Sequence, residues 1–363
     1  MGDFSQNGIV STLHDFKTKS TDEIEKELLE FSKERKMELI LPCLYSELEG
    51  EALPKIVSEI SKTKYLNHII IGLDKANKNQ AKDAWKFFKK LKTDFTILWN
   101  DGPRLQKLDE ELKEKSLAPN QPGKGRNVWY CLGMSIARDT ARSVALHDCD
   151  IKTYDRRMLA KLLYPVVNPV FNFEFCKGFY PRIANEKMNG RVARLLVAPL
   201  LIALEKTIGS SEYLQFMKSF KYPLSGEFSF RRNVLSELRI SSDWGIEVGV
   251  LSEMQRNFSP NNICQVDLAD TYDHKHQDLS LDDETKGLSK MSIDIIKTFI
   301  KKLATQGNSF SRETFRSLKA TYYRCALDMI DIYRSDATMN GLKFDSHNAV
   351  SYTHLTLPTN REV

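Results

Sequence analysis

The chain has 363 residues, of which 41% are hydrophobic, which is enough for one large α/β domain or two smaller ones. Its formal net charge of +5 is mild and spread along the sequence, which suits a small anionic substrate and argues against a nucleic-acid-binding protein. The six cysteines form no CxxC pair, a pattern that indicates reduced thiols and argues against disulfides or a zinc site.

Targeting segments are not evident in the sequence. The N-terminus has no charged stretch followed by an apolar one, so we expect no signal peptide. The longest apolar run, around Leu195–Leu204, is too short to span a bilayer and predicts a buried helix. We therefore expect a cytoplasmic protein. Residues 350–363 do not continue the preceding helical pattern and resemble a cloning scar, so we leave this probable non-native tail out of the fold prediction.

The first half of the chain alternates between helical and strand patterns. Residues 1–37 are polar and helical in pattern and predict an N-terminal helical extension. Strands are expected over Glu38–Pro42, His68–Gly72 and Phe95–Trp99, with amphipathic helices between them. This spacing predicts an α/β fold with a parallel sheet and right-handed crossovers, typical of a doubly wound nucleotide-binding domain.

Glycines on both sides of Lys124 precede a helix that is expected to run to about Arg142. They let the backbone approach a bound anion, and the lysine supplies a point charge. A Walker A loop would need an earlier glycine and a serine or threonine after the lysine, and both are absent, so this segment is not a P-loop. Taken alone, the motif is also explained by an ordinary helix entry.

The next strand ends in two carboxylates. The apolar run from Val144 to Leu146 predicts a buried strand, and Asp148 and Asp150 follow it two residues apart, on one face of extended backbone. Open α/β sheets bind ligands beyond the carboxyl ends of their strands. A carboxylate pair there suits a divalent cation that also binds phosphate oxygens. A strand running into an Asp-rich turn is the alternative.

The second half contributes three further candidates. Arg191 follows Gly190 at the expected start of the apolar helix, where it could bind a phosphate or carboxylate or simply be solvated. Glu247 lies between glycines in an apolar setting, and buried glutamates are uncommon unless paired or functional. His274 and His276 would share a face in extended backbone; one could complete a metal site, or both could be incidental surface residues.

Eight motifs in this order resemble a known family. They are Gly123–Gly125, Asp148–Asp150, Phe175–Tyr180, Gly190–Arg191, Pro223–Glu227, Gly245–Gly249, Gln265–Leu268 and His274–Gln277. The set is similar to the glucosyl-3-phosphoglycerate synthases, retaining glycosyltransferases of the GT-A type, over roughly residues 38–280. The resemblance implies a mostly parallel nucleotide-binding sheet flanked by helices, with a helical C-terminal appendage, in a homodimer.

The domains expected on this basis are a catalytic GT-A domain and two flanking segments. The ranges are 1–37 for the N-terminal extension, 38–280 for the catalytic domain (nucleotide-sugar half about 38–152, acceptor half about 153–280) and 281–349 for the C-terminal helices.

The resemblance also implies a metal-dependent mechanism. Asp148 and Asp150 would be the family's DXD pair, and Asp150 and His274, with Asp148, would hold Mg²⁺ or Mn²⁺ against the diphosphate of the nucleotide sugar. Lys124 would neutralise the leaving diphosphate. Glu247 would lie near the reacting sugar carbon and orient or stabilise, without acting as a covalent nucleophile, along a front-face path.

The resemblance assigns the binding residues as well, and the sequence departs from the family near several of them. Donor binding would involve Pro42, Leu44, Glu47, Leu73, Lys124 and Asp148, and the acceptor would be held by Gly190, Arg191 and His276. Tyr45–Ser46 stands where the family usually has Asn-Glu, and Gly72–Asp74 where it has an Asp-Ser run. Ala193 replaces a common threonine, and His276 a common asparagine.

The activity implied is transfer of glucose from UDP-glucose, with retention, to 3-phosphoglycerate, on the route to the compatible solute glucosylglycerate. Glycerate or another small hydroxy acid as acceptor, or GDP-mannose as donor, are alternatives. A sugar-phosphate nucleotidyltransferase would carry a glycine-rich signature that Met1–Ile60 lacks. A catalytically silent nucleotide-sugar-binding protein is a further alternative, and the intact Asp148, Asp150 and His274 set argues against it.

Overall fold

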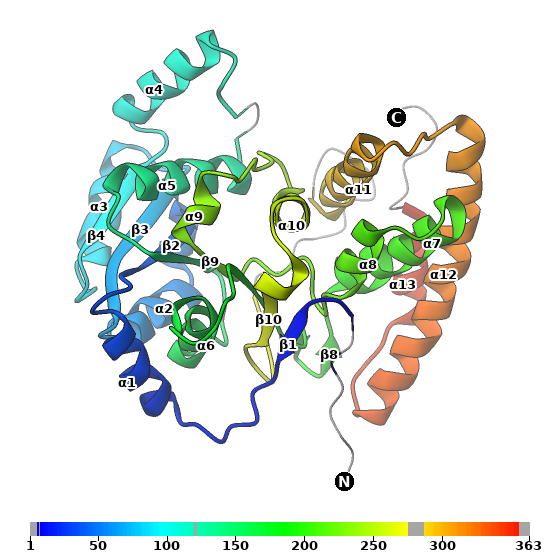
Figure 1. Ribbon diagram of the computed structural model, residues 1–363, viewed down its shortest axis with the longest axis horizontal. Helices are drawn as coiled ribbons and strands as arrows, with labels where there is room; N and C mark the ends of the chain where they lie inside the picture. The colour runs from blue at the N-terminus through cyan, green and yellow to red at the C-terminus, as the bar shows by residue number, and fades with distance from the viewer. Residues whose placement is uncertain (1–5, 7, 120–121, 275–286, 356–363) are drawn as a thin grey trace.

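The computed structural model of the chain describes residues 6, 8–119, 122–274 and 287–355, and an eight-stranded sheet lies at its centre (Figure 1). The strand order is β1-β10-β6-β9-β5-β2-β3-β4. Within this sheet only β9 runs antiparallel to its neighbours, which confirms the mostly parallel α/β fold. The strands of the sheet are β1 (Ser11–Leu13), β2 (Met37–Leu44), β3 (Leu66–Asp74), β4 (Phe95–Trp99), β5 (Ser143–Leu146), β6 (Phe175–Phe179), β9 (Phe228–Arg231) and β10 (Ile263–Asp267).

Helices cover both faces of this sheet. Leu39 and Leu41 of β2 join one hydrophobic cluster, whereas Ile40 between them joins another, as the two-residue period of a strand requires. The first cluster includes residues of α1 (Thr21–Phe31), α2 (Ala52–Ile60), α3 (Lys78–Phe88) and α6 (Arg156–Val167). The second includes residues of α5 (Lys124–Arg138), α7 (Ala198–Ile208), α8 (Glu212–Lys218), α9 (Arg232–Leu235) and α10 (Ile246–Asn257).

The N-terminal segment differs from its prediction. Helix α1 forms as expected, with Ser20 and Glu23 making a reciprocal capping box. Residues Ser11–Leu13, however, form strand β1, which pairs in parallel with β10 at the edge of the sheet. The prediction of a purely helical extension over residues 1–37 was therefore wrong at β1, because pairing with a distant strand outweighs the local polar pattern.

Two further helices have unusual sequences. The charged run Lys107–Lys115 lies largely within helix α4 (Pro103–Glu114), which projects from the upper left of the molecule in Figure 1. Pro165 lies inside α6, although proline usually ends or kinks a helix. Short 3₁₀ turns occupy Tyr45–Glu49 and Pro260–Asn262, and a small hairpin is formed by β7 (Ile183–Ala184) and β8 (Lys187–Met188).

The C-terminal helices pack onto the helices that cover the sheet. Helices α11 (Gly287–Thr305) and α12 (Arg312–Met339) contribute to the same hydrophobic cluster as α7. The Tyr322 hydroxyl of α12 donates to the Leu195 carbonyl oxygen at 2.8 Å. Leu195 belongs to a π-helical segment, Val192–Val197, that leads into α7. The expected long C-terminal helices are therefore present, and α12 runs along the right side of the molecule in Figure 1.

The segment from Val350 onward is partly helical, contrary to its exclusion from the fold prediction. Helix α13 (Ser346–Leu355) runs through it, and Tyr352 is buried with its hydroxyl 3.0 Å from the Ser292 Oγ atom. Residues 356–363 lie outside the described part of the chain. Within the described residues, no helix is both long and apolar enough to cross a membrane.

Candidate functional site

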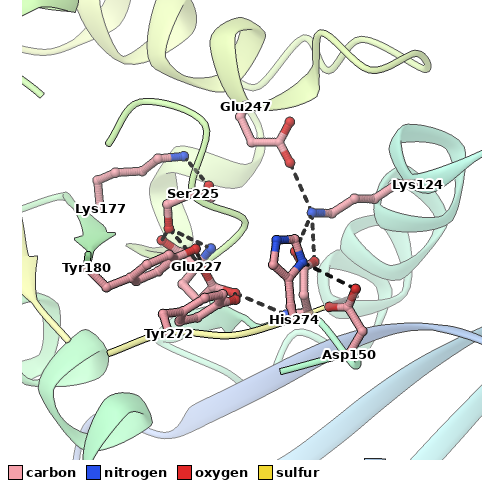
Figure 2. A network of polar contacts seen from close by, with 10 residues as sticks. Lys124, Asp150, Lys177, Tyr180, Ser225, Glu227, Glu247, Tyr272 and His274 are labelled. Carbon is pink, nitrogen blue, oxygen red and sulfur yellow. Dashed lines mark hydrogen bonds and ion pairs between the residues drawn. The ribbon is translucent and has the colours of Figure 1, made fainter. Parts of the chain in front are cut away.

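A cluster of charged side chains lies at the carboxyl edge of the sheet, beyond β5 (Figure 2). Asp148 and Asp150 follow β5, and Lys124 is the first residue of α5. Glu247 lies in the first turn of α10. These residues are far apart in the sequence, and the parallel sheet brings them to one edge, as expected for ligand binding in open α/β folds.

Lys124 joins two of the expected carboxylates. Its Nζ atom lies 2.7 Å from Asp148 Oδ1 and 3.0 Å from Glu247 Oε1. Burial disfavours the charged lysine, but the Asp148 and Glu247 carboxylates outweigh it and hold the pKa of Lys124 well above its usual value. Burial likewise works against the Asp148 carboxylate, yet the Lys124 ammonium lowers the pKa of Asp148. Lys124 is therefore a fixed positive charge within this cluster.

Asp150 and His274 form a second pair beside the first. An isolated antiparallel bridge between Ile151 and His274 brings the histidine against the carboxylates, and its Nδ1 atom lies 3.4 Å from Asp150 Oδ2. Asp150 Oδ1 is buried and has no hydrogen-bond partner. A carboxylate oxygen without a partner beside an imidazole nitrogen is a donor set that fits a divalent cation.

Asp150 and His274 alone do not complete the coordination shell of a divalent cation. Within the described residues, no group of three or more His, Cys, Asp or Glu side chains is arranged to hold a metal ion. Asp148, the expected further ligand, is engaged by Lys124. The remaining ligands would have to come from a bound molecule or from water, as is usual for magnesium sites that bind phosphates.

Glu227 lies at the centre of a hydrogen-bond network that the sequence did not reveal (Figure 2). It accepts from the hydroxyls of Tyr180 at 2.6 Å and Tyr272 at 2.9 Å, and from Ser225 Oγ at 3.0 Å. The rings of the two tyrosines stack with centroids 3.6 Å apart. The Asp148 backbone N–H also donates to Glu227, at 3.5 Å. Glu227 therefore supports the backbone that carries Asp148.

Gly226 allows this loop to approach the charged cluster closely. A Cβ atom at Gly226 would lie 2.2 Å from Asp148 Oδ2 and 2.7 Å from Lys124 Nζ. Both distances are shorter than van der Waals contact, so a side chain here would displace the ion pair. Glycine at this position therefore leaves room for the Lys124–Asp148 ion pair.

Replacing Gly226 with alanine is expected to lower the free energy of unfolding by about 1–3 kcal/mol, because the new methyl group overpacks a buried ion pair. The matched control is Gly133→Ala in α5, where an added Cβ meets nothing within 4 Å. That control is expected to stabilise the protein by about 0.5–1 kcal/mol, because alanine favours a helix over glycine. Urea unfolding of both variants measures the difference; equal stability would contradict the close approach.

Lys177 is a fully buried lysine next to the same loop. Its Nζ atom donates to the Ser225 carbonyl oxygen at 2.6 Å. Burial lowers its pKa to about 8, although the nearby Glu247 and Glu227 carboxylates favour the charged form. The sequence motif Phe175–Tyr180 contains Lys177, but does not show that this lysine is buried beside two acidic residues.

The depressed pKa of Lys177 predicts a pH dependence of stability. Between about pH 8 and the usual value of 10.5, the unfolded chain binds a proton that the folded chain has lost. The Lys177 contribution to the free energy of unfolding should therefore rise with pH across this window. Melting temperatures of wild type and Lys177→Met measured against pH isolate the effect, with exposed Lys86→Met as control. The same pH slope in all three proteins would contradict it.

The expected donor-binding residues lie at the carboxyl ends of the neighbouring strands. Pro42 and Leu44 end β2, Glu47 follows in a 3₁₀ turn, and Leu73 lies near the end of β3. Because β2 pairs with both β5 and β3, these positions share the edge that carries Asp148 and Asp150. The Leu73 side chain is fully buried, so this residue offers a ligand only its backbone.

Polar side chains that the sequence did not single out lie beside Leu73. Asn100 Nδ2 donates to Asp74 Oδ1 at 2.7 Å, and Asn127 Nδ2 donates to the Gly72 carbonyl oxygen at 2.8 Å. Burial raises the pKa of Asp74. These groups extend the polar edge of the sheet from β5 to β3.

The expected acceptor residues lie on another element. Gly190 has a positive φ of 83°, and Arg191 precedes the π-helical segment Val192–Val197. Within the described residues, no hydrogen bond joins Gly190 to Lys124, Asp148 or Glu247. His276, the third expected acceptor residue, lies outside the described residues. The structure therefore brings together Lys124, Asp148, Asp150, Glu247 and His274, and leaves the acceptor assignment as a prediction.

Comparisons with known proteins bear on both the fold and the family. No family model matches the chain. It is 46% identical over 347 residues to the glucosyl-3-phosphoglycerate synthase of Persephonella marina, covering 96% of this chain and 86% of the relative. It is 36% identical over 357 residues to the glucosyl-3-phosphoglycerate synthase of Methanococcoides burtonii, covering 97% of this chain and 87% of that protein.

Solved structures show the same fold. A Mycobacterium tuberculosis glucosyl-3-phosphoglycerate synthase, in complex with Mn²⁺, UDP-glucose and phosphoglyceric acid, aligns with a TM-score of 0.59 at 22% identity. The alignment covers 81% of this chain and 87% of that chain. Another structure of the same enzyme, with Mg²⁺ and UDP, aligns with a TM-score of 0.57.

Proposed function

The chain belongs to the glucosyl-3-phosphoglycerate synthase family, and on that premise we propose that it transfers glucose from UDP-glucose to 3-phosphoglycerate. As a family member it is a glycosyltransferase. The observation that carries the proposal is the convergence of Lys124, Asp148, Asp150, Glu247 and His274 at the carboxyl edge of the sheet. In solved relatives of this fold, UDP-glucose and phosphoglyceric acid are bound together.

Asp150 and His274 would hold a divalent cation, Mg²⁺ or Mn²⁺. Two observations support this: Asp150 Oδ1 is buried without a partner, and His274 Nδ1 lies beside the other carboxylate oxygen. The M. tuberculosis enzyme has been solved with either metal in the presence of UDP. When bound, the cation supplies a Lewis acid that stabilises charge on the diphosphate. Asp148 is the other carboxylate of the DXD pair. It would support the cation site by holding Lys124 in place and by binding water.

Lys124 would bind the diphosphate as it leaves. Its Nζ atom is held between Asp148 and Glu247, so its charge is positioned before the donor arrives. Pro42, Leu44, Glu47 and the Leu73 backbone would surround the nucleotide, since they follow the strands next to β5. Glu247 would orient Lys124 and face the sugar.

Transfer would proceed with retention along a front-face path. The bond from the anomeric carbon to the diphosphate oxygen breaks, and its electron pair leaves with UDP. A new bond forms from the acceptor hydroxyl oxygen to the same face of the anomeric carbon, and the hydroxyl proton passes to the departing diphosphate. Lys124 stays protonated throughout, as its raised pKa allows.

The acceptor would be held by Gly190, Arg191 and His276. Arg191 supports this because a guanidinium binds carboxylate and phosphate groups with two parallel hydrogen bonds. Glycerate or another small hydroxy acid remains the alternative acceptor, because Ala193 and His276 depart from the common family residues, and GDP-mannose remains the alternative donor. The product would feed the synthesis of the compatible solute glucosylglycerate.

Product analysis by proton NMR separates these possibilities. Each donor is incubated with 3-phosphoglycerate and with glycerate, and the anomeric proton of the product is recorded. The proposal predicts one product, glucosyl-3-phosphoglycerate, with the anomeric configuration of UDP-glucose. An inverted product would refute the front-face path, and faster turnover with glycerate or GDP-mannose would move the substrate assignment to that alternative.

Two features of the cellular context belong to the same proposal. A cytoplasmic location is supported by the six cysteines, which are all buried and unpaired, as in proteins of reducing compartments. A homodimer through the C-terminal helices, which the family resemblance implies, is supported by Ile332 and Met339, two exposed apolar side chains seven positions apart on one face of α12. Light scattering of the purified chain measures the dimer, and a monomeric mass would exclude it.

A further inference from the structure

Tyr272 lies two residues before His274, one of the expected metal ligands, on the segment that follows β10. Its side chain is buried, with 1% of its surface exposed. The Tyr272 hydroxyl donates to Glu227 Oε1 at 2.9 Å (Figure 2), and the ring packs edge-on against the His274 imidazole, with ring centroids 5.6 Å apart. One buried side chain therefore contacts both an expected metal ligand and the Glu227 carboxylate.

The two carboxylate oxygens of Glu227 have different partners. Oε1 accepts from the Tyr272 hydroxyl and, at 3.5 Å, from the backbone N–H of Asp148. Oε2 accepts from the Tyr180 hydroxyl at 2.6 Å and from Ser225 Oγ at 3.0 Å. Oε1 therefore joins the two segments that carry the expected metal ligands, whereas the Oε2 bonds lead to the end of β6 and to the loop before Glu227 itself.

Glu227 is itself fixed to the sheet. It is fully buried, and its backbone carbonyl oxygen accepts from the Gly178 N–H of β6 at 2.9 Å. Lys177, the buried lysine of the same strand, donates to the Ser225 carbonyl oxygen at 2.6 Å and so holds the loop that leads into Glu227. Buried polar networks whose members all have partners are rigid, so Glu227 offers a fixed point to the groups that donate to it.

The segment that carries His274 also runs beside the carboxylate pair that follows β5. An isolated antiparallel bridge joins Ile151 to His274, and the Lys152 N–H donates to the Asp273 carbonyl oxygen at 2.8 Å. These backbone contacts set the distance between the two segments. The orientation of the imidazole ring depends in addition on its side-chain neighbours, and the Tyr272 ring is one of them.

We propose that Tyr272 is a positioning residue for the divalent cation, because its hydrogen bond to Glu227 holds His274 beside the carboxylate pair. Without the Tyr272 hydroxyl, Oε1 keeps the longer bond from the Asp148 N–H, and Glu227 no longer joins both segments. Groups that orient metal ligands change metal affinity about 10- to 100-fold when they are replaced. The inference rests on the proposed function for the cation site at Asp150 and His274.

Tyr180 provides a matched control for Tyr272. The two rings stack with centroids 3.6 Å apart, both side chains are buried, and both hydroxyls donate to the same carboxylate. Tyr272→Phe and Tyr180→Phe therefore each remove one hydroxyl and keep the stacked rings. They differ in the oxygen that loses a donor, which is Oε1 for Tyr272 and Oε2 for Tyr180, where Ser225 Oγ still donates.

Binding of Mn²⁺ to the whole chain in saturating UDP, followed by electron paramagnetic resonance of the free ion, tests the proposal. Tyr272→Phe is expected to raise the Kd for Mn²⁺ about 10- to 100-fold, whereas Tyr180→Phe should change it by less than about threefold, because Oε2 keeps another donor. Melting temperatures without metal should fall to a similar extent in both variants, since each loses one buried hydrogen bond. A purely structural role for Tyr272 would lower the melting temperature without separating the two Kd values.

Excess metal provides a second readout. The Mn²⁺ concentration for half-maximal turnover should rise in Tyr272→Phe by the same factor as the Kd, and kcat at saturating Mn²⁺ should return close to the wild-type value. Equal Kd values for Mn²⁺ in the two variants, or no Mn²⁺ binding by the wild type, would overturn the proposal. A wild type that binds Mn²⁺ and forms no product would contradict the proposed function alone, because metal binding is measured without turnover.

Discussion

Replacing Lys124 with methionine is expected to lower kcat about 100- to 1,000-fold, the usual cost of removing one positioned group that stabilises charge in the transition state. Lys124 is the cation that contacts both Asp148 and Glu247, at 2.7 Å and 3.0 Å. Without Lys124, the departing diphosphate faces the Asp148 and Glu247 carboxylates without the ammonium group that pairs with both. Steady-state kinetics of Lys124→Met measure the effect, and Lys107→Met, an exposed lysine of α4, is the control.

Lys124→Met should also be less stable than the wild type at low pH. In the wild type, the Lys124 ammonium lowers the pKa of Asp148. The ion pair therefore stabilises the folded protein at every pH above the usual pKa of aspartate. This stabilisation is lost as the pH falls through the lowered pKa of Asp148. Lys124→Met should therefore unfold at a higher pH than the wild type during acid titration. A kcat within tenfold of the wild type and an unchanged acid transition would together show that Lys124 has no part in the site.

Removing the divalent cation is expected to abolish detectable turnover, and adding Mg²⁺ or Mn²⁺ should restore it. Asp150 and His274 are the protein donors placed for the ion, so Asp150→Asn and His274→Ala should each lower kcat/KM at least about 100-fold and raise the metal concentration needed for half-maximal activity. Activity after dialysis against EDTA, followed by titration with each metal, measures both quantities.

The control for these variants is Asp270→Asn, an exposed aspartate paired with Lys17 on the surface. It should keep the activity and the metal dependence of the wild type. Full turnover in EDTA would contradict the assignment of Asp150 and His274, and so would an Asp150→Asn enzyme with an unchanged requirement for metal.

The sequence predicted the sheet and the individual residues of the site better than the contacts that these residues make with one another. Alternating strands and helices indicated the parallel sheet, and the carboxylates after Val144–Leu146 indicated its active edge. That Lys124 contacts both Asp148 and Glu247 was not visible in the sequence, because Lys124 and Glu247 are 123 residues apart. Strand β1 was missed for a similar reason: three residues in a polar segment become a strand only by pairing with β10.

The Glu227 network shows why the rest required the structure. In the sequence, Glu227 is only the last residue of the motif Pro223–Glu227, yet its carboxylate accepts from Tyr180, 47 residues before it, and from Tyr272, 45 residues after it.

The most direct test of the account is mass spectrometry of the reaction of the purified chain with UDP-glucose and 3-phosphoglycerate, with Mg²⁺ and with EDTA. The account predicts a product with the mass of glucosyl-3-phosphoglycerate, formed with Mg²⁺ and absent with EDTA. Equal product in both samples would contradict the metal site at Asp150 and His274, and no product with Mg²⁺ would contradict the proposed transfer itself.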